Sequence, residues 1–180
     1  MTIVEEIEID NDVSIKQYKS LKEDLNSIRR NRWTQLGEAN FEGPIYALWE
    51  IFNKSLSKED AVYTDSKVED VTDREDFMRN PTIIGMSKNS LENRVWGGIW
   101  FENLPNNQAL MHIKCNRSEY RSYAHHLVKY FVDKFQDKYK QINIAWGSRN
   151  KEDDPTNFLK RNGFKINHSG YDGGFASMNL

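Results

Sequence analysis

The residues best suited to bind a charged ligand lie in residues 109–135, which read ALMHIKCNRSEYRSYAHHLVKYFVDKF. This segment opens as an alternating apolar run, passes through a polar loop and continues as an amphipathic helical pattern. A strand, a short loop and a helix in that order aim unpaired backbone N–H groups and the positive end of the helix dipole at one point. The sequence therefore predicts a site for an anion, typically a phosphate, at the start of this helix.

The histidines of this segment offer further chemistry, but no metal site. His125 and His126 at the helix start could hydrogen-bond a phosphate; alternatively, one faces solvent and the other packs inside. The chain has four histidines and a single cysteine, Cys115, at spacings that match no metal motif, so we expect no metal. Nucleophile-elbow, P-loop and dinucleotide-binding motifs do not occur in the sequence.

Length and composition favour one globular domain spanning residues 1–180, since 180 residues can bury a sizeable core. The apolar fraction of 38% and the 22 aromatic residues (five Trp, eight Tyr and nine Phe) are above the range of disordered chains. Net charge is −2 and no Lys/Arg block exceeds two residues, so we expect no nucleic-acid partner. Without a signal peptide or a long apolar run, the sequence predicts a cytoplasmic protein that does not interact with membranes.

In the N-terminal half the patterns predict one strand followed by helices. Thr2–Ile9 alternates like a strand. Ser14 and Gln17 have capping-box spacing, which predicts a helix from Ser14 to about Arg30 or Trp33. Three further elements are expected before the next strand: a helix starting at Pro44, a loop over Ser57–Val71, and a short helix from Thr72 to Pro81.

In the C-terminal half the pattern changes to strands interleaved with two helices. The predicted strands are Thr82–Lys88, Arg94–Glu102, Ala109–Cys115, Gln141–Gly147, Phe164–Asn167 and Phe175–Leu180. Gly97 and Gly98 suggest a bulge or a close approach to the backbone. The two helices are the one after the polar loop, with an apolar stripe from Ala124 to Phe135, and one over residues 154–163. The order β-α-α-β-β-β-α-β-α-β-β predicts a mixed α/β (α+β) fold.

Four segments in this order resemble the GNAT superfamily of acetyl-CoA-dependent N-acetyltransferases. NFLKRNGF resembles that family's FYEKLGF-type segment, and RVWGGIWF its glycine-containing third strand. SEYRSYAHHL lies where the family's pyrophosphate-binding loop would be, and FASMNL resembles its last strand. The resemblance implies a mostly antiparallel sheet splayed at its middle, helices on both faces, and transfer of an acetyl group from acetyl-CoA to an amine.

The resemblance also implies which residues hold the coenzyme, although the loop departs from the family pattern Q/R-x-x-G-x-G/A. Ser122 and Ala124 stand where glycines are expected, or Arg121 leads and Ala124 takes the first glycine position. Backbone amides of Ser122, Tyr123, Ala124 and His125 would then bind the pyrophosphate. The strand backbone at Ile113 and Cys115 would bind the pantetheine arm. Asn150 loosely matches a family asparagine, and it could equally belong to a solvated loop.

For catalysis, the resemblance leaves several alternatives open. The family's acid is the tyrosine of its FY pair, and Leu159 takes that position here, so Tyr123 or Tyr171 would have to donate the proton. His112 lies near where family members place a carboxylate and is a candidate general base. Trp33, Tyr46 and Tyr171 are candidates for contact with the acceptor. The alternative function is a catalytically inactive GNAT-like binding or assembly protein with a macromolecular partner; a homodimer is also left open.

Overall fold

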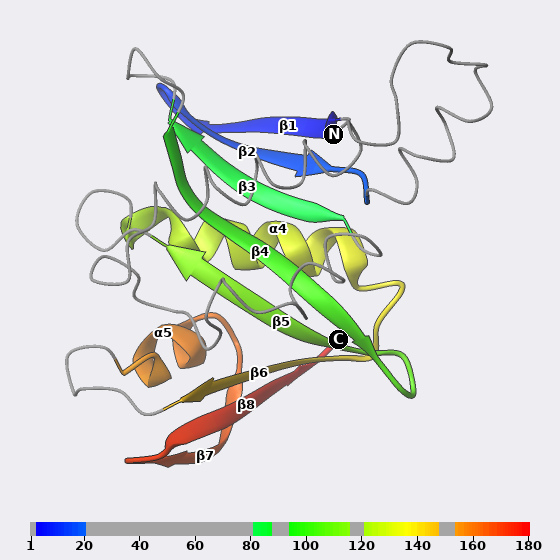
Figure 1. The fold of residues 1–180 in the computed structure, drawn as a ribbon, viewed down its shortest axis with the longest axis vertical. Helices are drawn as coiled ribbons and strands as arrows, with labels where there is room; N and C mark the ends of the chain where they lie inside the picture. The colour runs from blue at the N-terminus through cyan, green and yellow to red at the C-terminus, as the bar shows by residue number, and fades with distance from the viewer. Residues whose placement is uncertain (1–2, 21–80, 88–93, 116–120, 148–153) are drawn as a thin grey trace, which may run out of the picture.

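The computed structural model describes residues 3–20, 81–87, 94–115, 121–147 and 154–180. These residues form an eight-stranded sheet in the order β1-β2-β3-β4-β5-β6-β8-β7, in which β5 and β6 are the parallel pair. The described part is therefore a mixed α/β structure built on a mostly antiparallel sheet, as the sequence predicts (Figure 1). The strands are β1 (Ile3–Asp10), β2 (Val13–Tyr18), β3 (Thr82–Ser87), β4 (Arg94–Leu104), β5 (Gln108–Cys115), β6 (Gln141–Gly147), β7 (Lys165–Gly170) and β8 (Gly173–Asn179).

The prediction of a helix beginning at Ser14 is wrong, because residues 13–18 form β2. β1 and β2 make a hairpin whose turn contains Asp12 with a left-handed φ of 67°, a conformation that aspartate tolerates. The capping-box spacing of Ser14 and Gln17 is outweighed because β2 pairs with β1 on one side and β3 on the other. Ile15 at the centre of β2 is fully buried by this arrangement.

The antiparallel meander β3-β4-β5 confirms the three strands predicted after Pro81. A bulge interrupts the register of β3 and β4: Gly85 pairs with Gly97 and Met86 with Val95, so Trp96 is the extra residue. The predicted bulge therefore lies one residue before the two glycines. A Cβ atom on Gly85 would lie 2.3 Å from the Trp96 ring, so only glycine leaves room for this indole.

Helix α4 (Ala124–Phe135) follows a short 3-10 turn, η1 (Arg121–Tyr123), and lies against β3 and β4 (Figure 1). Its apolar stripe fills the core on this face of the sheet, and the Phe131 ring meets the Phe101 ring edge-on at 5.0 Å. Phe101 pairs across the strands with Met111, so residues of β5 that alternate with Met111 face the other side. The buried residues of α4 are Ala124, Leu127, Val128, Tyr130, Phe131 and Phe135.

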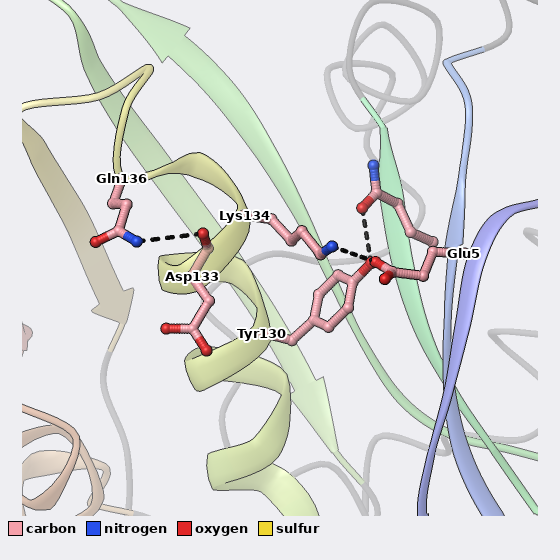
Figure 2. Close-up of polar contacts among 6 residues, drawn as sticks. Glu5, Tyr130, Asp133, Lys134 and Gln136 are labelled. Carbon is pink, nitrogen blue, oxygen red and sulfur yellow. Dashed lines mark hydrogen bonds and ion pairs between the residues drawn. The ribbon is translucent and has the colours of Figure 1, made fainter.

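The hairpin β1–β2 is tied to α4 by polar side chains (Figure 2). Tyr130 Oη lies 2.6 Å from Glu5 Oε2 and 2.8 Å from Gln17 Oε1, and Lys134 Nζ lies 2.5 Å from Glu5 Oε2. The hydrogen bond from Lys134, followed by that from Tyr130, lowers the pKa of the Glu5 carboxyl. Burial and the Glu5 carboxylate raise the pKa of the Tyr130 hydroxyl, so it remains protonated.

The sheet opens between β5 and β6. These strands pair in parallel over three residues only, Gln108–Leu110 with Gln141–Asn143, although β5 continues to Cys115 and β6 to Gly147. In Figure 1 the two strands start side by side and separate towards their arrowheads. This divergence is the splay that the resemblance implied.

Beyond the splay, β6, β8 and β7 with helix α5 (Thr156–Arg161) form the C-terminal part of the sheet. The helix predicted over residues 154–163 is confirmed. Asp154 Oδ1 accepts a hydrogen bond of 2.9 Å from the Thr156 N–H, Pro155 precedes the first turn, and Gly163 has a φ of 90°. Trp146 of β6 lies over Gly174 of β8, where a Cβ atom would be 2.1 Å from the indole.

The predicted helix at Pro44, the loop over Ser57–Val71, the helix from Thr72 and the continuation of the first helix past residue 20 lie outside the described residues. Among the helices that the structure does describe, none is long and apolar enough to cross a membrane.

Candidate active site

The start of α4 has features that suit an anion. Tyr123 occupies the N-cap position without a side-chain cap, and the first turn contains no acidic residue. The first amide groups of α4 therefore have neither a side-chain oxygen that caps them nor a carboxylate in the same turn. Ser122 and His125 are exposed, whereas the Ala124 side chain is fully buried. Of the predicted loop, residues 121–125 are thus described, and residues 116–120 lie outside the described residues.

The Tyr123 hydroxyl is engaged by the N-terminal hairpin. It donates a hydrogen bond of 2.8 Å to Asp10 Oδ2, and this bond lowers the pKa of the Asp10 carboxyl. The Tyr123 ring lies 6.0 Å from that of Trp96, the residue placed by the β4 bulge. The structure therefore joins Tyr123 to a carboxylate, an arrangement that the sequence did not reveal because Asp10 is 113 residues away.

The two histidines of α4 differ in their environments. Their ring centroids are 4.0 Å apart, with His125 exposed and His126 partly buried. The pKa of His126 is lowered, mainly because burial disfavours the charged ring and secondly because of electrostatic interactions with His125 and Lys129. The neutral form of His126 accordingly predominates near pH 7.

The strand residues predicted to bind the coenzyme lie on the diverging part of β5. Ile113 comes three residues after Leu110, where pairing with β6 ends, and its side chain is fully buried in the core beneath α4. Cys115 is the last residue of β5 and pairs with Gly97 of β4. Asn150 lies outside the described residues.

His112 lies on the other face of the sheet, because it alternates with the core residues Met111 and Ile113. It is 7% exposed and comes two residues after the end of the β5–β6 pairing. Its ring stacks on Trp100, the cross-strand partner on β4, with centroids 5.6 Å apart and planes 10° apart. Its Nε2 atom lies 3.5 Å from Glu102 Oε2. The candidate base is therefore a buried imidazole next to a carboxylate.

A buried amide lies at the point where the strands part. Asn143 of β6 pairs with Leu110 of β5 and is 2% exposed. Its Nδ2 donates to Gln108 Oε1 at 3.1 Å and to the Ala109 carbonyl at 3.4 Å, while Gln141 Nε2 donates to its Oδ1 at 2.7 Å. A buried amide needs such partners, so this cluster fixes the junction of β5 and β6.

The remaining predicted residues are Leu159, Tyr171, Trp33 and Tyr46. Leu159 is fully buried in the core, consistent with a packing role for the residue at the family's tyrosine position. Tyr171 is 95% exposed at the turn between β7 and β8. Trp33 and Tyr46 lie outside the described residues.

Three residues of this site were missed by the sequence analysis: Trp100, Glu102 and Asn143. A signal for the first two was available. Pro105-Asn106-Asn107 predicts a tight turn, and both asparagines have left-handed φ values, 64° and 56°. Counting back from that turn places Trp100 opposite His112, with Glu102 diagonal to it. Asn143 carried no such signal, because its role depends on the parallel pairing with β5.

No family model and no curated relative matches the sequence. Solved structures match at low identity. Ribosomal-protein-S5-alanine acetyltransferase from Vibrio fischeri has a TM-score of 0.53 at 15% identity, over 97% of this chain and 96% of its own. yncA from Salmonella typhimurium, solved with its cofactor acetyl-CoA, has a TM-score of 0.53 at 13% identity, over 75% and 87%.

A Bacillus subtilis acetyltransferase in complex with CoA has a TM-score of 0.51 at 13% identity, over 62% of this chain and 84% of its own. Likeness at this level of identity concerns the fold. Together with the mostly antiparallel sheet and its opening between β5 and β6, it shows that this chain has the fold of the GNAT acetyltransferases.

Proposed function

We propose that this chain is a single-domain member of the GNAT superfamily that transfers the acetyl group of acetyl-CoA directly to an amine. The observation that carries the proposal is the opening between β5 and β6, which begins after Leu110, beside the strand that leads to α4. The complexes of two structural neighbours with acetyl-CoA or CoA support the choice of co-substrate.

The residues at the start of α4 fit an anionic group. Backbone amides of Ser122, Tyr123, Ala124 and His125 would hold the pyrophosphate, because this turn has no capping side chain and no acidic residue. The unpaired edge of β5 at Ile113 and Cys115 would bind the pantetheine arm. Among the described residues, Asp10 is a carboxylate hydrogen-bonded to this turn, and its exposure allows solvent to screen its charge.

The chemistry needs a neutral amine, and His112 would supply the base. The imidazole takes a proton from the ammonium group, and the amine nitrogen then attacks the carbonyl carbon of the thioester. The carbon–sulfur bond breaks, and the remaining ammonium proton of the intermediate passes to the thiolate sulfur. The proton held by His112 then goes to solvent. Under this scheme no separate acid is required, which accommodates leucine at position 159.

Titration of the protein with acetyl-CoA by isothermal calorimetry tests the proposal. Ser122 has an exposed side chain, so Ser122→Glu should fold while placing a negative charge at the predicted pyrophosphate site. We expect Ser122→Glu to raise the Kd at least about tenfold. The glutamate would repel the pyrophosphate, and a loss of about 1.4 kcal/mol in binding free energy corresponds to a tenfold higher Kd. Ser122→Gln, of nearly equal size and no charge, should bind almost like the wild type. Absence of binding at millimolar acetyl-CoA in the wild type would contradict the proposal.

A second candidate is a GNAT-like protein that binds a macromolecular partner without catalysis. It is favoured by the buried Leu159 and by the Tyr123 hydroxyl that is already bonded to Asp10. Release of free thiol from acetyl-CoA in the presence of an amine panel separates the two candidates. Sustained amine-dependent release excludes the second one.

A further inference from the structure

We propose that Glu102 is a positioning residue for His112: it orients the imidazole and stabilises the imidazolium formed when His112 takes the proton of the acceptor amine. This inference rests on the proposed acetyl transfer. It goes beyond it by assigning a role to a carboxylate on β4, a strand to which that function gives no part.

The relative position of the two groups is fixed by the backbone. β4 and β5 pair without interruption from Gly97 with Cys115 to Leu104 with Gln108, and a three-residue turn closes the hairpin. Glu102 and His112 are diagonal neighbours on one face of this ladder, with Oε2 and Nε2 3.5 Å apart. Because both lie on strands and neither on a loop, their separation is held by the sheet hydrogen bonds.

Trp100 restricts the remaining freedom of the imidazole. Its indole is 1% exposed and stacks nearly parallel to the His112 ring. Stacking fixes the plane of the imidazole, because turning the ring away from the parallel arrangement would lose its packing against the indole. The ring is thus held in one plane, and its Nε2 atom lies 3.5 Å from Glu102 Oε2.

Exposure differs between the two partners in a way that suits proton transfer. The His112 side chain is 9% exposed, whereas that of Glu102 is 34% exposed. A cation on the buried ring is costly without a counter-charge, and the carboxylate supplies it. Because Glu102 reaches water, its carboxylate can remain ionised beside the buried ring.

The pair also has the correct place relative to the opening of the sheet. His112 comes two residues after Leu110, and Asn143 of β6 lies on the same face as both. The ionisable group that β4 places against the ring is Glu102, and β6 presents the uncharged amide of Asn143 on this face. Among the described residues, a substrate in the opening would therefore meet the imidazole beside the Glu102 carboxylate.

The test compares Glu102→Gln with Glu6→Gln, a matched change on β1 that removes a half-exposed carboxylate lying 3.8 Å from Lys16. One measurement is the pH profile of kcat/KM for acetyl transfer to n-butylamine. The other is the titration of the His112 ring by NMR, which needs no turnover. With less stabilisation of the imidazolium in Glu102→Gln, both midpoints should fall by about 0.5–1 pH unit, and kcat should fall about three- to tenfold. Glu6→Gln should change neither.

The outcomes separate this inference from the function on which it rests. A wild type that neither binds acetyl-CoA nor transfers acetyl overturns the proposed function, and the inference falls with it. Transfer with an unchanged profile and an unchanged ring titration in Glu102→Gln overturns the role of Glu102 alone. If Glu102→Gln does not fold, Glu102→Ser is measured in its place, with the same expected shift.

Discussion

The two parts of the sheet on either side of the β5–β6 junction share one apolar core but differ in the contacts that hold their outer strands. In the N-terminal part, the edge hairpin β1–β2 is joined to α4 through hydroxyl, carboxylate and ammonium groups, centred on Glu5 and Tyr130 (Figure 2). In the C-terminal part, the close packing between strands is apolar: Trp146 of β6 covers Gly174 of β8, and Leu159 and Phe164 lie in the core. Strand pairing joins the two parts over three residue pairs of β5 and β6.

This difference has a consequence for the site between them. Contacts among ionisable groups depend on pH and salt, whereas close packing of an indole on a glycine does not. The start of α4 is attached to the pH-dependent part through Tyr123 and Asp10. Conditions that loosen the hairpin should therefore affect the proposed coenzyme site while β6 and β8 stay in place.

The largest effect is expected from a change in the apolar packing of the C-terminal part. Gly174→Ala places a Cβ atom 2.1 Å from the Trp146 ring and 2.6 Å from the His168 carbonyl oxygen, so the backbone itself would have to move. We expect a loss of about 3 kcal/mol in the free energy of unfolding, measured by urea denaturation. Gly147→Ala is the matched control, because no atom lies within 4 Å of its added Cβ. Equal losses in the two variants would contradict the packing argument.

Most of the C-terminal half could be predicted from sequence because its signals are local. Asp154, Pro155 and Gly163 mark the two ends of one helix, and the strands around it alternate clearly. The N-terminal hairpin was missed because its turn, Asn11-Asp12, lacks the glycine of the strongest hairpin signal. The spacing of Ser14 and Gln17 favours a helix. Residues 13–18 form a strand because they pair with β3, which lies about 70 residues later in the chain.

For the site, the sequence identified individual residues but not their partners. His112 was singled out by its titration range, while Glu102 and Trp100 become relevant only through the register of β4 and β5. Tyr123 was a candidate acid by residue type, and its bond to Asp10 depends on the hairpin that the sequence did not predict. Register and long-range pairing are thus what single-sequence reasoning lacked.

A smaller effect is expected from a change in the amide cluster around Asn143, at the junction of β5 and β6. Asn143→Leu keeps the volume of a buried side chain but leaves the Ala109 carbonyl and the half-buried Gln108 and Gln141 without its amide. We expect a loss of about 2 kcal/mol in unfolding free energy and faster hydrogen exchange in residues 109–111. Asn167→Leu, at an exposed position bonded to Ser177, should change stability by less than about 0.5 kcal/mol. Unchanged exchange in β5 would show that the amide cluster does not hold the junction.

The smallest effect is expected from a change in the polar contacts between α4 and the hairpin β1–β2, whose contribution to stability should depend on pH. Tyr130→Phe removes the hydroxyl that contacts Glu5 and Gln17, and should cost about 1 kcal/mol near pH 7. Tyr171→Phe, at a side chain that is 95% exposed, should cost almost nothing.

The sign of the pH dependence follows from Glu5. Its folded-state pKa lies below the ordinary value of 4.5, so its contribution is present above that value and is lost as pH falls through the folded-state pKa. The difference between wild type and Tyr130→Phe should accordingly shrink at about pH 3, while the Gly174→Ala difference, which involves no ionisable group, should persist at both pH values. Thermal denaturation of the three proteins at the two pH values measures this. A Tyr130→Phe difference that is constant with pH would mean that the ionised Glu5 adds no stability through Tyr130, and the outer strands of the two parts would then not differ in their pH dependence.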